Sequence, residues 1–381
     1  MKRLLLALVG TVACGSAGSA LPDAFVATIS SVAVTPGSVT AKRGLSQPAQ
    51  LTAKLSLSDS TTLDITNNVT WASSDSTVAA VSETGRVTPL AVGTAMVTAT
   101  YEGVTSTASA VTVPSTTMIL SDLSNSRLNI YDAYTDGPAL RQIVGTNTTL
   151  TAPWGVSVYH DELFVADQNA IEVFPANAAG NVVPTRRITG ALGASYNLAV
   201  YKDEIYVANG TKILVFPVTA NGNVAPTRTV GGAMTGLSSA YGLAVYKDEI
   251  YVTNFASVSV FPTGANGDLA PTRKITGSHT LLNSCYGVFV ENDEVYVTNL
   301  DGIRVWLTTS DGDVSPIRNL TGASTSISSA TGVNLLGNEL YVTNAGPTGT
   351  HAYPASVTGD AAPTRTISNM GTTNARTVTF Y

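Results

Sequence analysis

Six polar residues end short apolar runs at regular spacing, and four aromatic residues occupy a second regular position. The Asp and Asn residues are Asp122, Asp167, Asn209, Asn254, Asn299 and Asn344. The aromatic residues are Trp154, Tyr196, Tyr241 and Tyr286. Carboxylate and amide oxygens can hold a hard cation such as Ca²⁺, whereas aromatic rings can bind a sugar, a peptide or a hydrophobic loop. A fold that gathers both sets on one face would make that face a candidate ligand-binding surface.

Both sets belong to a unit of about 45 residues that recurs six times between Met118 and the C-terminus. Each unit has apolar runs such as GLAVY, IYVTN and VSVFP, separated by turn residues. A period of this length carried by short strands indicates a β-propeller, and four antiparallel strands make one blade. The sequence therefore predicts an all-β fold, with six blades within residues 115–381.

The two ends of the repeat region predict how the ring closes. The first unit begins at its second strand, 118–122, and the chain ends with the run RTVTFY at 376–381. This last run has the pattern of a first strand, so we expect it to complete the first blade and to remove an open sheet edge. In this alignment Thr331 and Ala375 occupy the two places that correspond to the four aromatic residues.

Each candidate set also has a purely structural interpretation. Asp and Asn side chains cap tight turns by hydrogen bonding to nearby backbone, and a Tyr before a Gly can wedge neighbouring blades apart. Only Asp122 and Asp167 supply charge for a cation, so weak Ca²⁺ binding on the axis is the one cofactor that the sequence leaves open. We otherwise expect no cofactor.

Catalytic residues are scarce on the expected channel face. Of His160, His279 and His351, only His279 is expected there. The sequence has no G-x-S-x-G, H-E-x-x-H or Cys–His motif. It favours a binding protein and leaves open a hydrolase or lyase acting on a small lactone- or sugar-like extracellular substrate. A metal on the axis, or a deep pocket holding His279 and a carboxylate, would favour the enzyme. A shallow aromatic funnel would favour binding.

The N-terminus and the overall charge predict where the protein works. Residues 1–20 read as a signal peptide and tether, with a basic start followed by a short apolar run. Cys14 is a candidate for lipidation, and cleavage after Ala20 is the alternative. The expected product is an outer-membrane or cell-surface lipoprotein, or a periplasmic or secreted protein, with membrane contact only through the lipid. The net charge of −6 argues against nucleic acid as a partner. Cys285 is expected to be a small buried apolar residue.

Residues 28–114 predict a separate β-sandwich, because short runs alternate apolar and polar residues between turns. The stretch 69–101 contains Trp-x-Ser-Ser-Asp, Gly-x-Val-Thr and Gly-Thr-Ala-x-Val-Thr-Ala. It resembles the bacterial immunoglobulin-like domains of group 2. That resemblance implies a non-catalytic surface spacer or adhesion module with Trp71 in its core.

The repeat region resembles NHL-type and related lactonase- or lyase-like propellers through its Gly-Val-x-Val, Tyr-Val-Thr-Asn and Ile-x-Val-Phe runs. The resemblance implies a scaffold that binds a protein or carbohydrate at the cell surface, or an enzyme with lactonase or lyase activity. Each unit also carries an Arg near its last strand: Arg141, Arg186, Arg228, Arg273, Arg318 and Arg365. We expect these charges to discourage pairing of the outer strands, with a basic binding stripe as the alternative.

Overall fold

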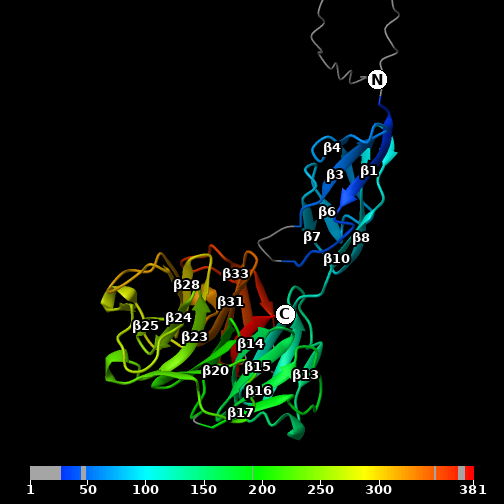
Figure 1. Cartoon of the computed structure of the whole chain (residues 1–381). Helices are drawn as coiled ribbons and strands as arrows, with labels where there is room; N and C mark the ends of the chain where they lie inside the picture. Colours follow the sequence, from blue (N-terminus) through cyan, green and yellow to red (C-terminus); the bar gives the residue numbers. More distant parts are fainter. Residues whose placement is uncertain (1–26, 44–48, 191, 347–348, 368–373) are drawn as a thin grey trace, which may run out of the picture. The chain divides into compact units, whose positions relative to one another are not determined.

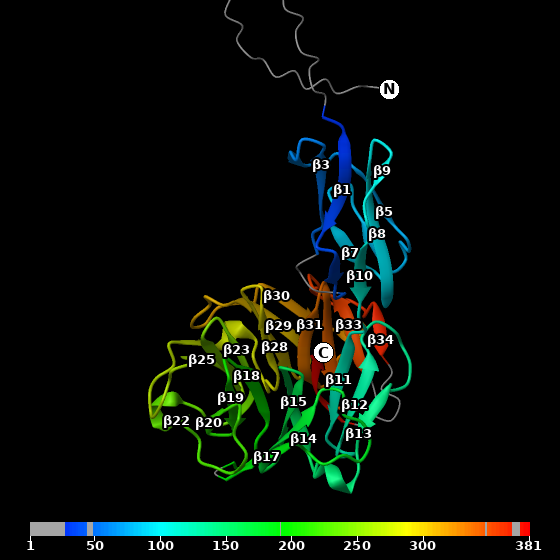
Figure 2. The same ribbon diagram turned by 45° about the vertical axis from the view of Figure 1, so that its right-hand side comes forward.

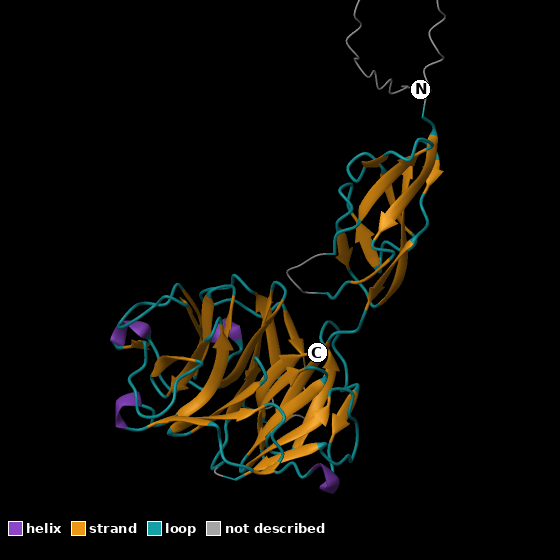
Figure 3. Ribbon diagram, in the orientation of Figure 1, coloured by secondary structure: helices purple, strands orange, loops and turns teal. Residues whose placement is uncertain are grey.

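The computed structural model describes residues 27–43, 49–190, 192–346, 349–367 and 374–381 (Figures 1 and 2). These residues form strands, loops and a few 3₁₀ turns (Figure 3). They separate into two compact units, one lying mainly before Thr112 and the other consisting mainly of Val113–Tyr381. In these described ranges, no helix is long and apolar enough to cross a membrane.

The first unit contains two main sheets. One has the order β1 (Ile29–Thr35), β3 (Thr52–Leu57), β4 (Thr62–Asp64). The other has the order β2 (Ser38–Thr40), β10 (Ser109–Val113), β8 (Gly93–Tyr101), β5 (Thr70–Ser73), with β9 (Val104–Thr105) on β8; β6 (Ala79–Val81) and β7 (Val87–Pro89) pair separately. Alternate residues of β8 are buried, as expected for strands with one face on a core. Trp71 is only half-buried, and its indole N–H donates to the Thr66 carbonyl at 3.0 Å.

The second unit contains six sheets, each built on four antiparallel strands, and they are numbered one to six here. Sheet one is β35 (Ala375–Phe380), β11 (Thr117–Asp122), β12 (Arg127–Asp132), β13 (Arg141–Ile143). Sheet two is β14 (Pro153–Tyr159), β15 (Glu162–Asp167), β16 (Ala170–Pro175), β17 (Arg186–Thr189), extended by β21 (Gly222–Asn223). Sheet three is β18 (Asn197–Tyr201), β19 (Glu204–Asn209), β20 (Lys212–Pro217), β22 (Arg228–Gly231).

The remaining sheets repeat the same order. Sheet four is β23 (Ala240–Tyr246), β24 (Glu249–Asn254), β25 (Ser257–Pro262), β26 (Arg273–Thr276). Sheet five is β27 (Val288–Glu291), β28 (Glu294–Asn299), β29 (Gly302–Leu307), β30 (Arg318–Thr321). Sheet six is β31 (Ala330–Leu336), β32 (Glu339–Asn344), β33 (Thr350–Pro354), β34 (Arg365–Ile367). The 3₁₀ turns η1 (Thr146–Thr148), η2 (Ala233–Thr235), η3 (Ser278–Thr280) and η4 (Ala323–Thr325) lie in the loops between sheets.

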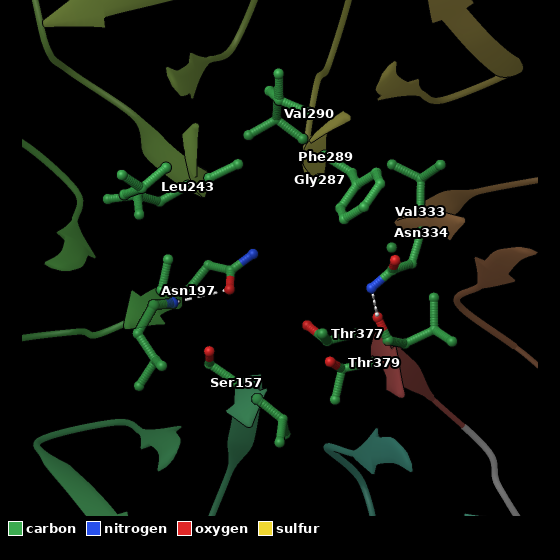
Figure 4. Close-up of a pocket in the computed structure, with 18 of the residues that line it drawn as sticks. Ser157, Asn197, Leu243, Gly287, Phe289, Val290, Val333, Asn334, Thr377 and Thr379 are labelled. Atoms are coloured by element: carbon green, nitrogen blue, oxygen red, sulfur yellow. Dashed lines mark hydrogen bonds between the residues drawn. The ribbon is translucent and has the colours of Figure 1, made fainter. Parts of the chain in front are cut away.

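The first strand of each sheet lies beside the first strand of the next, in the order β35, β14, β18, β23, β27, β31. Strand β31 in turn lies beside β35, and the first strands surround a common centre (Figure 4). The arrangement is propeller-like. It places the start of every first strand at one end of the centre and the first hairpin turns at the other end.

The C-terminal strand joins the two ends of this unit, as the sequence predicts. Val378 of β35 pairs with Leu120 of β11, and Phe380 pairs with Met118. Val378 is buried in an apolar cluster that contains residues of sheets one and six, and Phe380 packs against the same cluster. The Phe380 ring lies 4.9 Å from the ring of Tyr341 in sheet six.

The repeated Arg residues act differently from the prediction. Arg273 donates two hydrogen bonds to the carboxylate of Glu249, at 2.7 and 2.6 Å, and only 23% of its side chain is exposed. Arg228 makes the same bidentate pair with Glu204 and also donates to the Thr263 carbonyl of the next sheet at 3.0 Å. The paired Arg lowers the pKa of the Glu carboxyl. These are partly buried ion pairs that tie a sheet to itself and its neighbour, not exposed charges along an edge.

Candidate functional site

The four aromatic side chains form one continuous cluster. The ring of Trp154 lies 5.1 Å from that of Tyr196, edge to face, and 6.4 Å from that of Tyr241, stacked. Tyr196 and Tyr241 meet edge to face at 4.7 Å, and Tyr241 lies 5.5 Å from Tyr286. Edge-to-face and offset arrangements at these separations are favourable for aromatic pairs. The structure thus brings together residues from four successive sheets. Their rings pack against one another and do not stand apart around a funnel.

The backbone beneath the cluster explains this placement. Each of Trp154, Tyr241 and Tyr286 precedes a Gly at the start of a first strand. A Cβ on Gly242 would meet the Tyr286 carbonyl of the next sheet and would lie 2.9 Å from Thr253 Oγ1. At this position the close approach of β23 to the next sheet therefore requires a residue without a side chain.

Hydroxyl groups of the preceding sheet hold two of the ring-bearing backbones. Ser121 Oγ donates to the Trp154 carbonyl at 2.5 Å, and Thr253 Oγ1 donates to the Tyr286 carbonyl at 2.9 Å. The first is a bond from sheet one to sheet two and the second a bond from sheet four to sheet five. The rings therefore stand on backbone that is fixed by hydrogen bonds between sheets.

The cluster has a fifth member, Arg376, which the sequence did not predict. The predicted alignment of the C-terminal strand with the other first strands is wrong by one residue. Ala375 was expected at the ring position, but it lies opposite the last residue of the second strand, as Ala240 does in sheet four. Arg376 therefore corresponds to Tyr241. Its guanidinium carbon lies 4.4 Å from the centre of the Trp154 ring, a cation–π contact.

The sixth equivalent position, in sheet six, carries a small buried residue and adds nothing to the cluster surface. Thr331 is 3% exposed, and its hydroxyl donates to the Ala375 carbonyl at 2.7 Å. The cluster thus covers five of the six sheets, with aromatic rings in sheets two to five and a cation in sheet one.

The cluster is partly open to solvent. All four rings and Arg376 are half-buried, so the cluster is neither an exposed patch nor a wedge lost between sheets. Burial raises the pKa of the Tyr241 phenol and lowers the pKa of the Arg376 guanidinium. An arginine guanidinium is not deprotonated in proteins, so Arg376 is a cation here.

A channel of about 220 Å³ runs along the first strands (Figure 4). One residue of each sheet, at equivalent register, lines its middle: Ser157, Ala199, Ala244, Phe289, Asn334 and Thr379. Asn334 is turned to the backbone, because its amide donates to the Val378 carbonyl at 3.1 Å. The side chains that line the channel are thus uncharged and mostly small or apolar, and Phe289 is the one aromatic side chain among them.

The six Asp and Asn residues mostly hold the loop that leads into the first strand of their own sheet. Asp167 accepts hydrogen bonds from the backbone N–H groups of Thr151 at 2.9 Å and Ala152 at 2.5 Å. Asn254 accepts from those of Ser238 and Ser239 at 2.9 and 2.8 Å.

Two other members of the set behave similarly, and a third does not. Asn299 and Asn344 accept from one loop N–H each. Asp122 instead pairs with Arg127 at 3.1 Å. Asp122, Asp167, Asn254, Asn299 and Asn344 are buried and Asn209 is half-buried. These contacts match the turn-capping alternative, and the predicted ligand role of this set gains no support from them.

The candidate acid–base and metal groups do not converge in the described ranges. His279 pairs with Asp313 at 2.8 Å, but 72% of the imidazole is exposed on a loop, away from the channel lining. His351 is buried in β33, where burial lowers its pKa. No group of three His, Cys, Asp or Glu side chains in the described ranges could hold a metal ion.

The structure describes one of the two cysteines. Cys285 is 1% exposed, and burial raises the pKa of its thiol to about 12, so it is a small apolar core residue as expected. Cys14, the predicted lipidation site, lies outside the described residues, as does the predicted signal peptide.

The first unit matches a family model described as "Bacterial Ig-like domain (group 2)" over residues 28–112. Residues 28–112 form a domain of that family. The match agrees with the prediction from the stretch 69–101, and it covers the two sheets of the first unit.

Two bacterial proteins are similar to this chain over short stretches. Lacto-N-biosidase of Bifidobacterium bifidum is 42% identical over 92 residues, which are 24% of this chain and 8% of that protein. Ice-binding protein 1 of Shewanella frigidimarina is 42% identical over 71 residues, which are 19% of this chain and 8% of that protein. The chain thus spans less than a tenth of the length of these relatives.

Solved structures resemble a larger part of the chain. A chain in the crystal structure of a nidogen/laminin complex superposes with a TM-score of 0.53 and 12% identity, covering 70% of this chain and 98% of that one. A protein of unknown function from Bacteroides caccae gives 0.52 and 11%, covering 69% and 98%. At such low identity the likeness extends to the fold alone, and it supports an all-β, propeller-like second unit.

Proposed function

We propose that this chain is an exported recognition or scaffold protein of the bacterial cell envelope. In this proposal the second unit is a six-bladed propeller closed by its C-terminal strand, and each sheet is one blade. The propeller binds a protein or carbohydrate through the end of the channel that carries Trp154, Tyr196, Tyr241 and Tyr286. The Ig-like domain acts as a spacer. The observation that carries the proposal is the half-buried aromatic cluster, built from four successive sheets.

The cluster has the physical properties of a binding surface that exists before the partner arrives. The rings contact one another and stand on backbone that is hydrogen-bonded between sheets. Little side-chain entropy is therefore left to lose on binding. Aromatic residues of this kind are enriched among those that dominate binding energy.

The alternative of a hydrolase or lyase lacks a comparable observation. Its best acid–base pair, His279 with Asp313, is exposed on a loop instead of sitting in a deep pocket. The channel is lined by uncharged side chains. The geometry therefore supports binding better than catalysis.

The test compares two tyrosines at opposite ends of one strand. Tyr241 is the second residue of β23 and Tyr246 is its last, and both are half-buried. The full-length protein is incubated with envelopes from cells that lack its gene, and the bound fraction is measured by sedimentation. Tyr241→Ala is expected to weaken binding about tenfold or more, while Tyr246→Ala leaves it unchanged. Equal binding by wild type and Tyr241→Ala would overturn the proposal.

A further inference from the structure

The cluster contains a cation that has no acidic partner among the described residues. The Arg376 guanidinium stacks on Trp154. Its Nε is buried and makes no hydrogen bond within the described part of the chain. Five of the six repeat-related arginines, such as Arg273, are instead paired with a Glu. The sixth, Arg141, donates to two backbone carbonyls.

An unpaired guanidinium of this kind favours a particular ligand group. Arg presents several N–H donors in a planar fork that matches the two oxygens of a carboxylate. Stacking on Trp154 fixes the plane of the guanidinium and leaves its edge for hydrogen bonding. Because the site is partly desolvated, a carboxylate bound here would gain more than it would at an exposed Arg.

The rest of the cluster suggests what carries the carboxylate. Tyr196, Tyr241 and Tyr286 offer apolar ring faces. Their phenol hydroxyls make no hydrogen bond within the described residues, and they are not among the buried unsatisfied atoms. A saccharide has apolar C–H faces and hydroxyl groups on the same small ring, so it can use both features at once. An uncharged sugar would leave Arg376 unpaired, and a simple acidic peptide would leave the ring faces unused.

We propose that the aromatic cluster and Arg376 form a binding site for an acidic saccharide, with Arg376 holding the carboxylate of a uronic acid. This proposal rests on the proposed function, in which the same face binds an envelope component. Sugar rings stack against Trp154 and the three tyrosines, and the phenol groups exchange hydrogen bonds with sugar hydroxyls. The competing explanation is structural: Arg376 would only brace Trp154 across the junction of sheets one and two.

The experiment is isothermal titration calorimetry of the full-length protein with defined probes. The acidic probes are trimers of galacturonic acid and of glucuronic acid, the neutral probe is cellotriose, and the peptide probe is triglutamate. At least one acidic trimer is expected to bind, more tightly than cellotriose or triglutamate. Arg376→Gln should weaken this binding roughly tenfold to a hundredfold, as expected for a charged hydrogen-bonded pair, and Tyr246→Ala should not change it.

Several results would overturn the proposal. These are the absence of binding by both acidic trimers, equal binding of cellotriose, tighter binding of triglutamate, or equal binding by wild type and Arg376→Gln. If Arg376→Gln fails to fold, Arg376→Lys keeps the charge and loses the fork, and unchanged affinity in that variant would count against the proposal. Envelope binding that depends on Tyr241 but not on Arg376 would refute the acidic saccharide and leave the proposed function standing.

Discussion

Val378→Ala tests whether the C-terminal strand holds the second unit together. Val378 is 2% exposed and pairs with Leu120 at the junction of sheets one and six. Its side chain belongs to the cluster that includes Met118 and Tyr341. The substitution removes two methyl groups from this cluster without touching the backbone ladder, so any loss of stability reports on the packing of this strand.

The expected loss follows from the burial. Each buried methyl is worth about 0.8 kcal/mol of transfer free energy, and the remaining cavity adds to this cost. We therefore expect Val378→Ala to lower the free energy of unfolding by about 2 kcal/mol. In a unit of this size, the thermal midpoint should fall by about 5 °C. Thr379→Ala, at the neighbouring channel-lining position, is the control and should shift the midpoint by about 1 °C or less.

Differential scanning calorimetry of the full-length protein measures both variants. Deleting 376–381 removes the whole strand and leaves Met118 and Leu120 without cover, so the transition of the second unit should broaden and move far lower. If the deletion left the midpoint unchanged, or if Val378→Ala behaved like Thr379→Ala, the strand would not be holding the ends together.

Three further predictions concern other parts of the chain. Glu249→Gln breaks the bidentate pair with Arg273 and should lower the free energy of unfolding by about 1 kcal/mol. Because the folded-state pKa of Glu249 is depressed, this contribution is fully present above the unfolded value near 4.5. It declines below that pH and is lost as the pH falls through the depressed folded pKa, so urea titrations of variant and wild type should converge over that acid range. Gly242→Ala places a methyl against the Tyr286 carbonyl and should cost about 1–3 kcal/mol in the same titrations; an unchanged midpoint would show that the strands can separate there. Cys14→Ala should move the protein from the membrane to the soluble fraction, and a wild type that is already soluble would refute lipidation.

The strand order of the second unit was predictable because its signals are local and repeated. Runs such as IYVTN at 250–254 end in a residue that caps a turn, and Lys247-Asp248 forms a two-residue hairpin turn with both residues at positive φ. The Ig-like domain was predictable for a similar reason, since its motifs occur in order along one short stretch.

The site was harder to predict, because its geometry depends on register between segments far apart in sequence. The position of Arg376 depends on the pairing of β35 with β11, and a shift of one residue in that pairing would put Ala375 in its place. The Arg–Glu pairs had a sequence signal, because five units have a Glu at the start of the second strand. The sequence alone did not show that this Glu lies close to the Arg of the fourth strand. For Asp167 and its equivalents, the sequence left both a ligand and a capping role open, and the loop contacts favour capping.

The most direct test of the central claim is the envelope-binding comparison of Tyr241→Ala and Tyr246→Ala in the full-length protein. Both substitutions truncate a half-buried tyrosine of β23, at opposite ends of the strand. We expect Tyr241→Ala to weaken envelope binding about tenfold or more and Tyr246→Ala to bind like the wild type, with both variants folded by calorimetry. Equal binding by the two variants, or a loss confined to Tyr246→Ala, would contradict it.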